Sequence, residues 1–378
     1  MLSLQEIKVW VLAPSLVTND SNIDYYYDFS QSIEEYKKVF ATLNIEWQWQ
    51  PVTINDYKTV IDDIANAISS SHKTPVIFNL CDGDEINGTP GVSVIQYLKT
   101  KKLLFTGSDE YFYNITTSKV PMKKAFDKYK VATPAWIAIK DRDENLDAVF
   151  KQLGSPIIVK PAVSGGSMGV GVKNVVHNVD ELKKLVQEMF DGYRGWQLTV
   201  DGIIAEEFID GPEFTTLIVG SHNNEEAAII YTPVERVFHE SLPATEKFLS
   251  FDRLWEIYED ETPMPNDENF YNYTSPDIQL HKEIMQLSWD AYCATKGVGY
   301  TRVDIRMDKH TNKMYVLEVN AQCGLSEDEN FTSIGAILRL GNKTYVELIK
   351  EILEDALLKI NQTKYKSIKR HKEKRSAA

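Results

Sequence analysis

Two short stretches near residues 300 and 320 carry acidic, amide and guanidinium side chains at a spacing of two. Arg302 and Asp304 lie in YTRVDIRMD. Glu318 and Asn320 lie in YVLEVNAQCG. Because side chains two apart share one face of a strand, each pair points the same way. If the strands are neighbours, the two carboxylates and the amide gather as an oxygen-rich cluster with the arginine beside it. That donor set suits Mg²⁺, a hard ion usually bound with its nucleotide. A hydrated sheet face is the alternative.

A glycine-rich turn follows an apolar strand in the run IIVKPAVSGGSMGVGV, residues 157–172. The strand delivers Lys160 at its end. Glycines let a backbone approach an anion closely and point several N–H groups at it, so a polyphosphate is the expected guest. The run lacks the closing Gly-Lys-Ser/Thr of a P-loop, and a strand rather than a helix is expected to follow it. A flexible hairpin between two strands is the alternative.

A third run, IIAEEFIDGPEFTTLIVG, covers residues 203–220. Two apolar segments flank Asp210, Gly211 and Pro212, a combination typical of a turn between strands. By itself this run indicates a hairpin and no chemistry.

Residues 1–115, the first of the regions that must position these runs, show an α/β pattern. Ile7–Ala13 is a nearly unbroken apolar run suited to a buried parallel strand. Ser32 and Glu35 form a capping-box pattern that predicts the start of a helix. Because strands and helices alternate, we expect a small α/β domain. Its other expected elements are strands at Pro75–Leu80 and Leu103–Phe105 and a helix at Val92–Thr100.

Two further lobes are expected after residue 115. The central lobe, residues 116–200, has an expected helix at Met122–Tyr129, strands at Trp136–Ile139, Pro156–Lys160 and Val170–Val176, and a helix capped by Asp180. The C-terminal lobe, residues 201–361, has expected strands at Ile203–Phe208, Phe214–Val219, Ala228–Pro233, Tyr300–Met307 and Met314–Val319, and helices at 277–295 and 344–360. The polar stretch Phe238–Pro276 shows few periodic signals and is predicted to be a lid. Residues 362–378 form a basic tail.

The composition excludes several functional classes. The chain has 55 acidic and 41 basic residues and a formal net charge of -14, which argues against a general nucleic-acid binder because that function needs a basic face. No run reaches the ~20 apolar residues that span a bilayer, so no membrane partner is expected. The 3 cysteines show neither metal-ligand spacing nor a disulfide framework, which favours a reducing compartment and a cytoplasmic location.

Taken in order along the chain, the three runs resemble the ATP-grasp superfamily, specifically its D-alanine–D-alanine ligase branch. The likeness extends from about Phe78 to the helix near Leu357, with support from NGTPG, FTGSD, TTSK and VATPAW between residues 87 and 136. It implies a chain of α/β and α+β parts with the ATP-grasp fold. Those parts would be an N-terminal Rossmann-like (pre-ATP-grasp) domain, a small central lobe and a C-terminal sheet domain. The resemblance also implies small-molecule carboxylate and amine substrates and a homodimer.

The resemblance implies a role for each matching residue. Lys119 and Lys160 would hold the phosphates of ATP, under a loop of Ser164, Gly165, Gly166, Ser167 and Gly169. Adenine would meet the backbone of Glu206, Glu207, Phe208 and Ile209, and ribose would meet Glu213. Two Mg²⁺ ions, with Mn²⁺ as a substitute, would be bound by Asp304, Glu318 and Asn320. The catalytic set would be Lys160, Arg302 and Gly324, the last two stabilising the acyl intermediate.

The substrate side departs from the family pattern. The family's His and Glu before the Gly-Thr turn are replaced by NLCDGDEINGT, which offers Asp82, Asp84 and Glu85. AQCGLSEDENF replaces Thr-x-Pro-Gly, and the family's acceptor-binding Ser has no clear counterpart. In the expected lid, Leu254 stands where the family has Lys, with Arg253 beside it as a substitute.

These patterns predict an ATP-dependent carboxylate–amine ligase that forms an amide through an acyl phosphate. A carboxylate is a poor electrophile, so its activation depends on positioning and charge neutralisation around the transferred phosphoryl group. Intact nucleotide positions beside altered substrate positions predict amino-acid or small-peptide substrates and a specificity different from D-alanine dimer formation. The alternatives are a natural-product amide ligase and a nucleotide-binding protein of this fold without ligase turnover.

Overall fold

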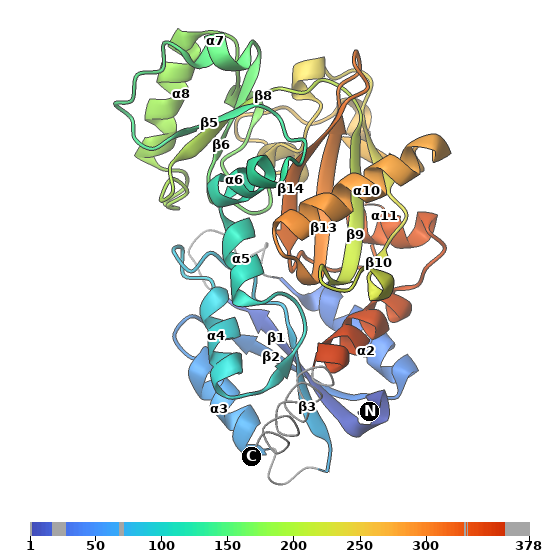
Figure 1. Ribbon diagram of the computed structural model, residues 1–378. Helices are drawn as coiled ribbons and strands as arrows, with labels where there is room; N and C mark the ends of the chain where they lie inside the picture. Colours follow the sequence, from blue (N-terminus) through green and yellow to red (C-terminus); the bar gives the residue numbers. More distant parts are fainter. Residues whose placement is uncertain (1, 17–27, 68–71, 329, 331, 360–378) are drawn as a thin grey trace, which may run out of the picture.

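The computed structural model describes residues 2–16, 28–67, 72–328, 330 and 332–359. The basic tail predicted at 362–378 lies outside these residues. Figure 1 shows three sheets with their helices: one at the bottom, one at the upper left and one at the upper right. Among the described residues, no helix is long and apolar enough to cross a membrane.

The first sheet is parallel and has the strand order β2-β1-β3-β4. Both faces are covered, which explains why the first strand is apolar almost throughout. The two helices α3 and α4 cover one face, and α2 covers the other together with the helix at residues 345–359. The bounds are β1 Ile7–Pro14, α2 Ser30–Leu43, β2 Glu46–Val52, α3 Tyr57–Ala67, β3 Thr74–Asn79, α4 Val92–Thr100 and β4 Leu104–Phe105. After β4, α5 (Glu110–Thr117) and α6 (Lys119–Tyr129) lead to the second sheet.

The second sheet is antiparallel and has the order β5-β8-β6-β7. Its elements are β5 Trp136–Ile139, α7 Val149–Leu153, β6 Ile157–Pro161, β7 Val175–Val176, α8 Val179–Asp191 and β8 Ile203–Glu207. The boundary predicted at residue 200 assigned β8 to the C-terminal lobe. That assignment is wrong, because β8 pairs with both β5 and β6 and its apolar side chains complete their core.

The third sheet has the order β12-β11-β9-β13-β14, with β10 paired to β9. The longest contact is the antiparallel pair β9 and β13, and β13 pairs in turn with β14. The α10 helix packs on one face and α11 on the other. The bounds are β9 Glu213–Ser221, β10 Ile229–Ile230, β11 Val234–Phe238, α9 Phe251–Leu254, β12 Tyr271–Thr274, α10 Ile278–Ala294, β13 Val298–Met307, β14 Met314–Ala321 and α11 Ser333–Leu340.

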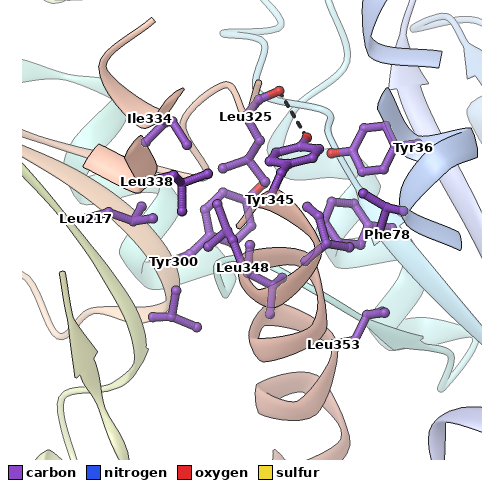
Figure 2. Close-up of a cluster of buried hydrophobic side chains, with 14 of the residues drawn as sticks. Tyr36, Phe78, Leu217, Tyr300, Leu325, Ile334, Leu338, Tyr345, Leu348 and Leu353 are labelled. Carbon is purple, nitrogen blue, oxygen red and sulfur yellow. Dashed lines mark hydrogen bonds between the residues drawn. The ribbon is translucent and has the colours of Figure 1, made fainter. Parts of the chain in front are cut away.

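One apolar core joins the first and third sheets. The Tyr36 ring lies 5.3 Å from Phe78 and 6.0 Å from Tyr345, measured between centroids. Figure 2 shows these rings around the helix that carries Tyr345, with Leu217 and Tyr300 reaching in from the third sheet. A capping box begins this helix: the backbone N–H of Thr344 donates to the Glu347 carboxylate, and the backbone N–H of Glu347 donates to the Thr344 hydroxyl. The helix from the C-terminal part of the chain therefore anchors the N-terminal sheet.

Three local predictions are wrong for identifiable reasons. The strand expected at Val170–Val176 is reduced to β7 at Val175–Val176, because Val172–Asn174 form a 3₁₀ turn in which the buried Asn174 amide donates to the carbonyls of Val159 and Gly169. Helix α2 begins at Ser30, so Ser32 is not its cap, and Glu35 accepts from Ser326 instead. Helix α8 is capped by Asn178 rather than by Asp180.

Candidate active site

A cavity of about 600 Å³ is lined by residues from all three sheets. The residues predicted from the sequence that line it are Lys119, Lys160, Ser164, Gly165, Gly166, Ser167, Glu206, Glu207, Phe208, Ile209, Glu213, Arg302, Asp304, Glu318, Asn320 and Gly324. Gly169 is the exception. Its backbone has φ +73°, and it packs beside Leu198 and Pro161, so it shapes the glycine loop from outside the cavity.

Two ammonium groups lie on the wall formed by the second sheet and α6. Lys119 begins α6, and its Nζ lies 3.5 Å from Oε2 of Glu318 on β14. The same Nζ donates to the backbone oxygen of Ser164 at 3.3 Å. Lys160, near the end of β6, has its Nζ 2.8 Å from Oε2 of Glu206 on β8. The sequence hypothesis required Lys160 and Glu318 to share one cleft, and both line this cavity.

Lys123 is a candidate residue that the sequence analysis missed. Its side chain is 0% exposed, one helical turn after Lys119, and its Nζ lies 2.6 Å from Oε1 of Glu206. Burial alone would raise the pKa of Glu206, but the two lysines beside it, Lys123 and Lys160, hold it at about 2. The spacing of four between Lys119 and Lys123 was an available signal, because it places both on one helix face.

The predicted convergence of Arg302, Asp304, Glu318 and Asn320 is confirmed. In the register of β13 and β14, Asp304 lies opposite Glu318 and Arg302 lies opposite Asn320. Nε and Nη2 of Arg302 donate to the Asp304 carboxylate at 3.0 and 2.9 Å, and Nδ2 of Asn320 donates to it at 2.9 Å. Burial would raise the pKa of Asp304, but the Arg302 guanidinium holds it below its usual value.

The donor set of this cluster fits magnesium bound together with a nucleotide. Asn320 uses Nδ2 toward Asp304, which leaves its amide oxygen available. Glu318 is partly exposed to the cavity, with a side chain at 30%. No group of three or more His, Cys, Asp or Glu side chains is gathered for a metal within the described residues. The protein would thus supply two carboxylates and one amide oxygen, and phosphate and water oxygens would complete the shell.

The segment predicted to meet adenine and ribose has part of its hydrogen bonding already occupied. The N–H groups of Glu207 and Phe208 donate to the carbonyls of Ala135 and Pro156. An adenine edge would therefore use the remaining groups of the segment. The buried Glu213 carboxylate pairs with Arg236, and its Oε2 lies 4.0 Å from Arg306. Two arginines thus hold the carboxylate that the sequence assigned to ribose.

The stretch Phe238–Pro276 covers the glycine loop and is more ordered than its sequence indicated. Nε1 of Trp255 donates to the Gly166 carbonyl at 2.8 Å, and Glu261 accepts from the backbone N–H of Val172 at 2.8 Å. The hypothesis that Arg253 replaces a lid lysine is wrong. Its guanidinium faces Glu246 at 2.7 Å and Glu261 at 3.4 Å, while Leu254 and Trp255 line the cavity.

The far end of the cavity is formed by loops that follow β3 and β14 and by the start of α11. Nε2 of Gln322 donates to the Cys81 carbonyl at 2.8 Å, which ties the loop carrying Gly324 to the loop carrying Asp82. Thr332 and Ser333 also line this end, and Thr332 caps α11 by accepting from Gly335. The sequence analysis missed this helix start, although a Thr before an apolar periodic run is a known capping signal.

The three-sheet arrangement and the cavity between the lobes define an ATP-grasp protein. The fold agrees with solved structures: the D-alanine–D-alanine ligase from Bacillus anthracis complexed with ATP superposes with a TM-score of 0.65 at 19% identity, covering 94% of this chain and 99% of that one. The family model described as D-ala D-ala ligase C-terminus matches residues 126–354. The chain therefore belongs to the D-alanine–D-alanine ligase C-terminal family.

Curated relatives agree with this family. The D-alanine–D-alanine ligase of Pelagibacter ubique (strain HTCC1062) is 27% identical over 317 residues, which covers 80% of this chain and 88% of that protein. The D-alanine–D-alanine ligase of Marinomonas sp. (strain MWYL1) is 25% identical over 262 residues, covering 68% and 71%. The fold and family predicted from the sequence are confirmed.

Proposed function

We propose that the protein is an ATP-dependent carboxylate–amine ligase. The main support for this proposal is the Lys119–Glu318 ion pair. It places an ammonium group suited to bind phosphate beside a carboxylate suited to bind a metal ion, and both line one cavity. ATP with magnesium would supply the phosphoryl group that turns a carboxylate into an acyl phosphate, which an amine then captures as an amide. Asp304, Glu318 and Asn320 would hold the metal.

The chain's own residues have three tasks in this chemistry. Lys119 and Lys160 offset phosphate charge from one wall, and the backbone of residues 164–167 faces the same space. Arg302 presents a guanidinium that Asp304 keeps fixed and charged, which suits it to stabilise negative charge that develops on the reacting carbonyl oxygen. The stretch Phe238–Pro276 contacts the glycine loop and would help to keep water from an acyl phosphate, which hydrolyses readily.

We further propose that the specificity differs from D-alanine dimer formation, with Asp82 as a determinant. Asp82 follows β3 and lines the cavity. The preceding residue, Cys81, accepts at its carbonyl from Nε2 of Gln322 at 2.8 Å, so Asp82 lies at the end of the cavity that Gly324 also lines. Asp82 is exposed, and within the described residues no side-chain cation pairs with it. An unpaired carboxylate of this kind favours a substrate with a protonated amino group.

The function is tested by ADP release with a panel of acids and amines, with hydroxylamine as a trap. Hydroxamate formation supports acyl phosphate chemistry, whereas tight ATP binding without turnover supports a nucleotide-binding protein. D-Alanine dimer formation as the sole efficient reaction would overturn the altered specificity.

Asp82→Asn is expected to raise KM for an amine-bearing acid about tenfold, because a hydrogen bond to a charged group contributes about 1.5–3 kcal/mol. KM for the matching acid without the amino group should stay near its wild-type value. Asp84→Asn is the matched control for this discrimination, since the Asp84 carboxylate already accepts from Asn87 at 3.0 and 2.8 Å. Equal changes for both acids would contradict the role of Asp82.

A further inference from the structure

The cluster of Lys123, Glu206 and Lys160 contains two ammonium groups and a single carboxylate. The carboxylate oxygens of Glu206 divide between them: Oε1 lies 2.6 Å from Nζ of Lys123 and Oε2 lies 2.8 Å from Nζ of Lys160. The side chains of Lys123, Glu206 and Lys160 are 0%, 2% and 17% exposed. Glu206 and Lys160 line the cavity and Lys123 does not. The cluster therefore runs from a buried cation, through a buried anion, to a cation that faces the cavity.

The geometry around Lys123 is that of an ammonium rather than a neutral amine. Its Nζ donates to Oγ1 of Thr133 at 2.5 Å and to the carbonyl of Val316 at 3.5 Å, and it forms an ion pair with Oε1 of Glu206 at 2.6 Å. The Thr133 hydroxyl donates its proton to the carbonyl of Val316, so the hydroxyl oxygen can accept a hydrogen bond from Lys123. All three neighbouring atoms present oxygen lone pairs to Nζ, which suits an ammonium, whereas a neutral amine would turn its own lone pair toward one of them. Burial lowers the pKa of Lys123, and the Glu206 carboxylate opposes that effect.

The charge balance of this cluster decides what a ligand in the cavity experiences. Glu206 cancels one of the two ammonium groups, which leaves one net positive charge. Without Lys123, the negative charge of Glu206 would cancel the positive charge of Lys160, and the cluster would have no net charge. Both partners of the buried Lys123–Glu206 pair are shielded from water, so solvent and salt screen their charges weakly. The difference in net charge therefore acts on a ligand several ångströms away.

We infer that Lys123 is a positioning residue for nucleotide binding, which balances Glu206 so that Lys160 offers an uncancelled positive charge to a phosphate-bearing ligand. This inference rests on the proposed function for the identity of that ligand, a nucleoside triphosphate with magnesium. Lys123 itself stays out of contact, since its side chain is enclosed by α6, β8 and β14.

The test measures the Kd of a non-hydrolysable ATP analogue with Mg²⁺ by calorimetry, without an acid substrate. Lys123→Met is expected to raise Kd about tenfold or more, as expected for one unit charge acting over several ångströms in a partly buried site. The combined variant Lys123→Met with Glu206→Gln removes the cation and the anion together. It is expected to bind the analogue more tightly than Lys123→Met alone, because the two changes are coupled through one ion pair. A purely structural role predicts the reverse order, with the combined variant binding no better than the single one.

Lys124→Met is the matched control, because it removes the same charge from the next, exposed position of α6. Its Kd should stay within about twofold of the wild-type value, as for a solvent-exposed charge. Should the combined variant not fold, the salt dependence of Kd for Lys123→Met decides the matter. A smaller slope than in the wild type supports the charge balance, and an unchanged slope overturns it.

Two results would overturn the inference while leaving the proposed function intact: wild-type affinity in Lys123→Met, or no recovery in the combined variant. Absence of analogue binding to the wild-type chain is a separate outcome, which would overturn the proposed function and this inference together.

Discussion

Arg302→Met is expected to lower kcat for amide formation about 10²- to 10³-fold, the loss that follows removal of one donor to a developing oxyanion. Arg302 lines the cavity beside Gly324, and two of its nitrogens are fixed on Asp304 at 3.0 and 2.9 Å. Burial would lower the pKa of its guanidinium, but Asp304 raises it, so the positive charge persists at every working pH. The charge and direction of the group are thus set before substrate arrives.

The measurement is kcat from ADP release with the best acid and amine, together with the Kd of the ATP analogue. The Kd should change little, since Arg302 acts on the acyl group rather than on the nucleotide. Arg302→Lys serves as the control: it keeps the charge but loses the planar fork, so an intermediate kcat is expected. A kcat within about threefold of wild type in Arg302→Met would exclude the assigned role.

Glu206→Gln is expected to lower the free energy of unfolding by about 3–5 kcal/mol, because removing one partner of a buried ion pair leaves an uncompensated charge. The charge left behind is Lys123, whose side chain is 0% exposed. Lys160 contributes less to the loss, since its side chain is 17% exposed and water can reach it. Urea unfolding at neutral pH measures the change.

Two controls separate the charge from the shape of the side chain. The combined variant Lys123→Met with Glu206→Gln should be more stable than Glu206→Gln alone, since no buried cation remains. The pH dependence gives the second control. Because the pKa of Glu206 is about 2 in the folded chain against 4.5 for an unperturbed glutamate, its ionised form stabilises the fold above about pH 4.5. That contribution is lost as the pH falls toward 2, and the variant should lack it. A loss below about 1 kcal/mol at neutral pH would mean that Lys123 finds other compensation.

Local sequence patterns predicted the elements that carry strong periodicity. The helix at Val92–Thr100 and the strand at Trp136–Ile139 have the bounds expected from their residues. The alternation in β13 and β14 also predicted which side chains would converge, since a strand permits only two directions. By contrast, β2 was missed although EWQWQPV alternates polar residues with tryptophans, which is the pattern of a half-buried strand. Its place in the sheet follows from pairing with β1, which no local pattern reveals.

Site residues could be predicted from the sequence where the residue type and its local motif are enough to indicate the chemistry. Lys160, Asp304 and Glu318 belong to that group. Lys123 does not, because its role depends on complete burial and on a partner 83 residues away, and neither is visible in KVPMKKAF. The order of the stretch Phe238–Pro276 was likewise hidden, since its ion pairs and its contacts with the glycine loop exist only in the folded chain.

The helix at residues 345–359 packs its apolar side chains on Tyr36, Phe78 and their neighbours, far away in the chain (Figure 2). During synthesis, α2 covers only part of this face of the first sheet, and the rest stays uncovered until the helix at residues 345–359 has left the ribosome. We therefore expect the core of the N-terminal part to be completed only after the C-terminal helix has been synthesised.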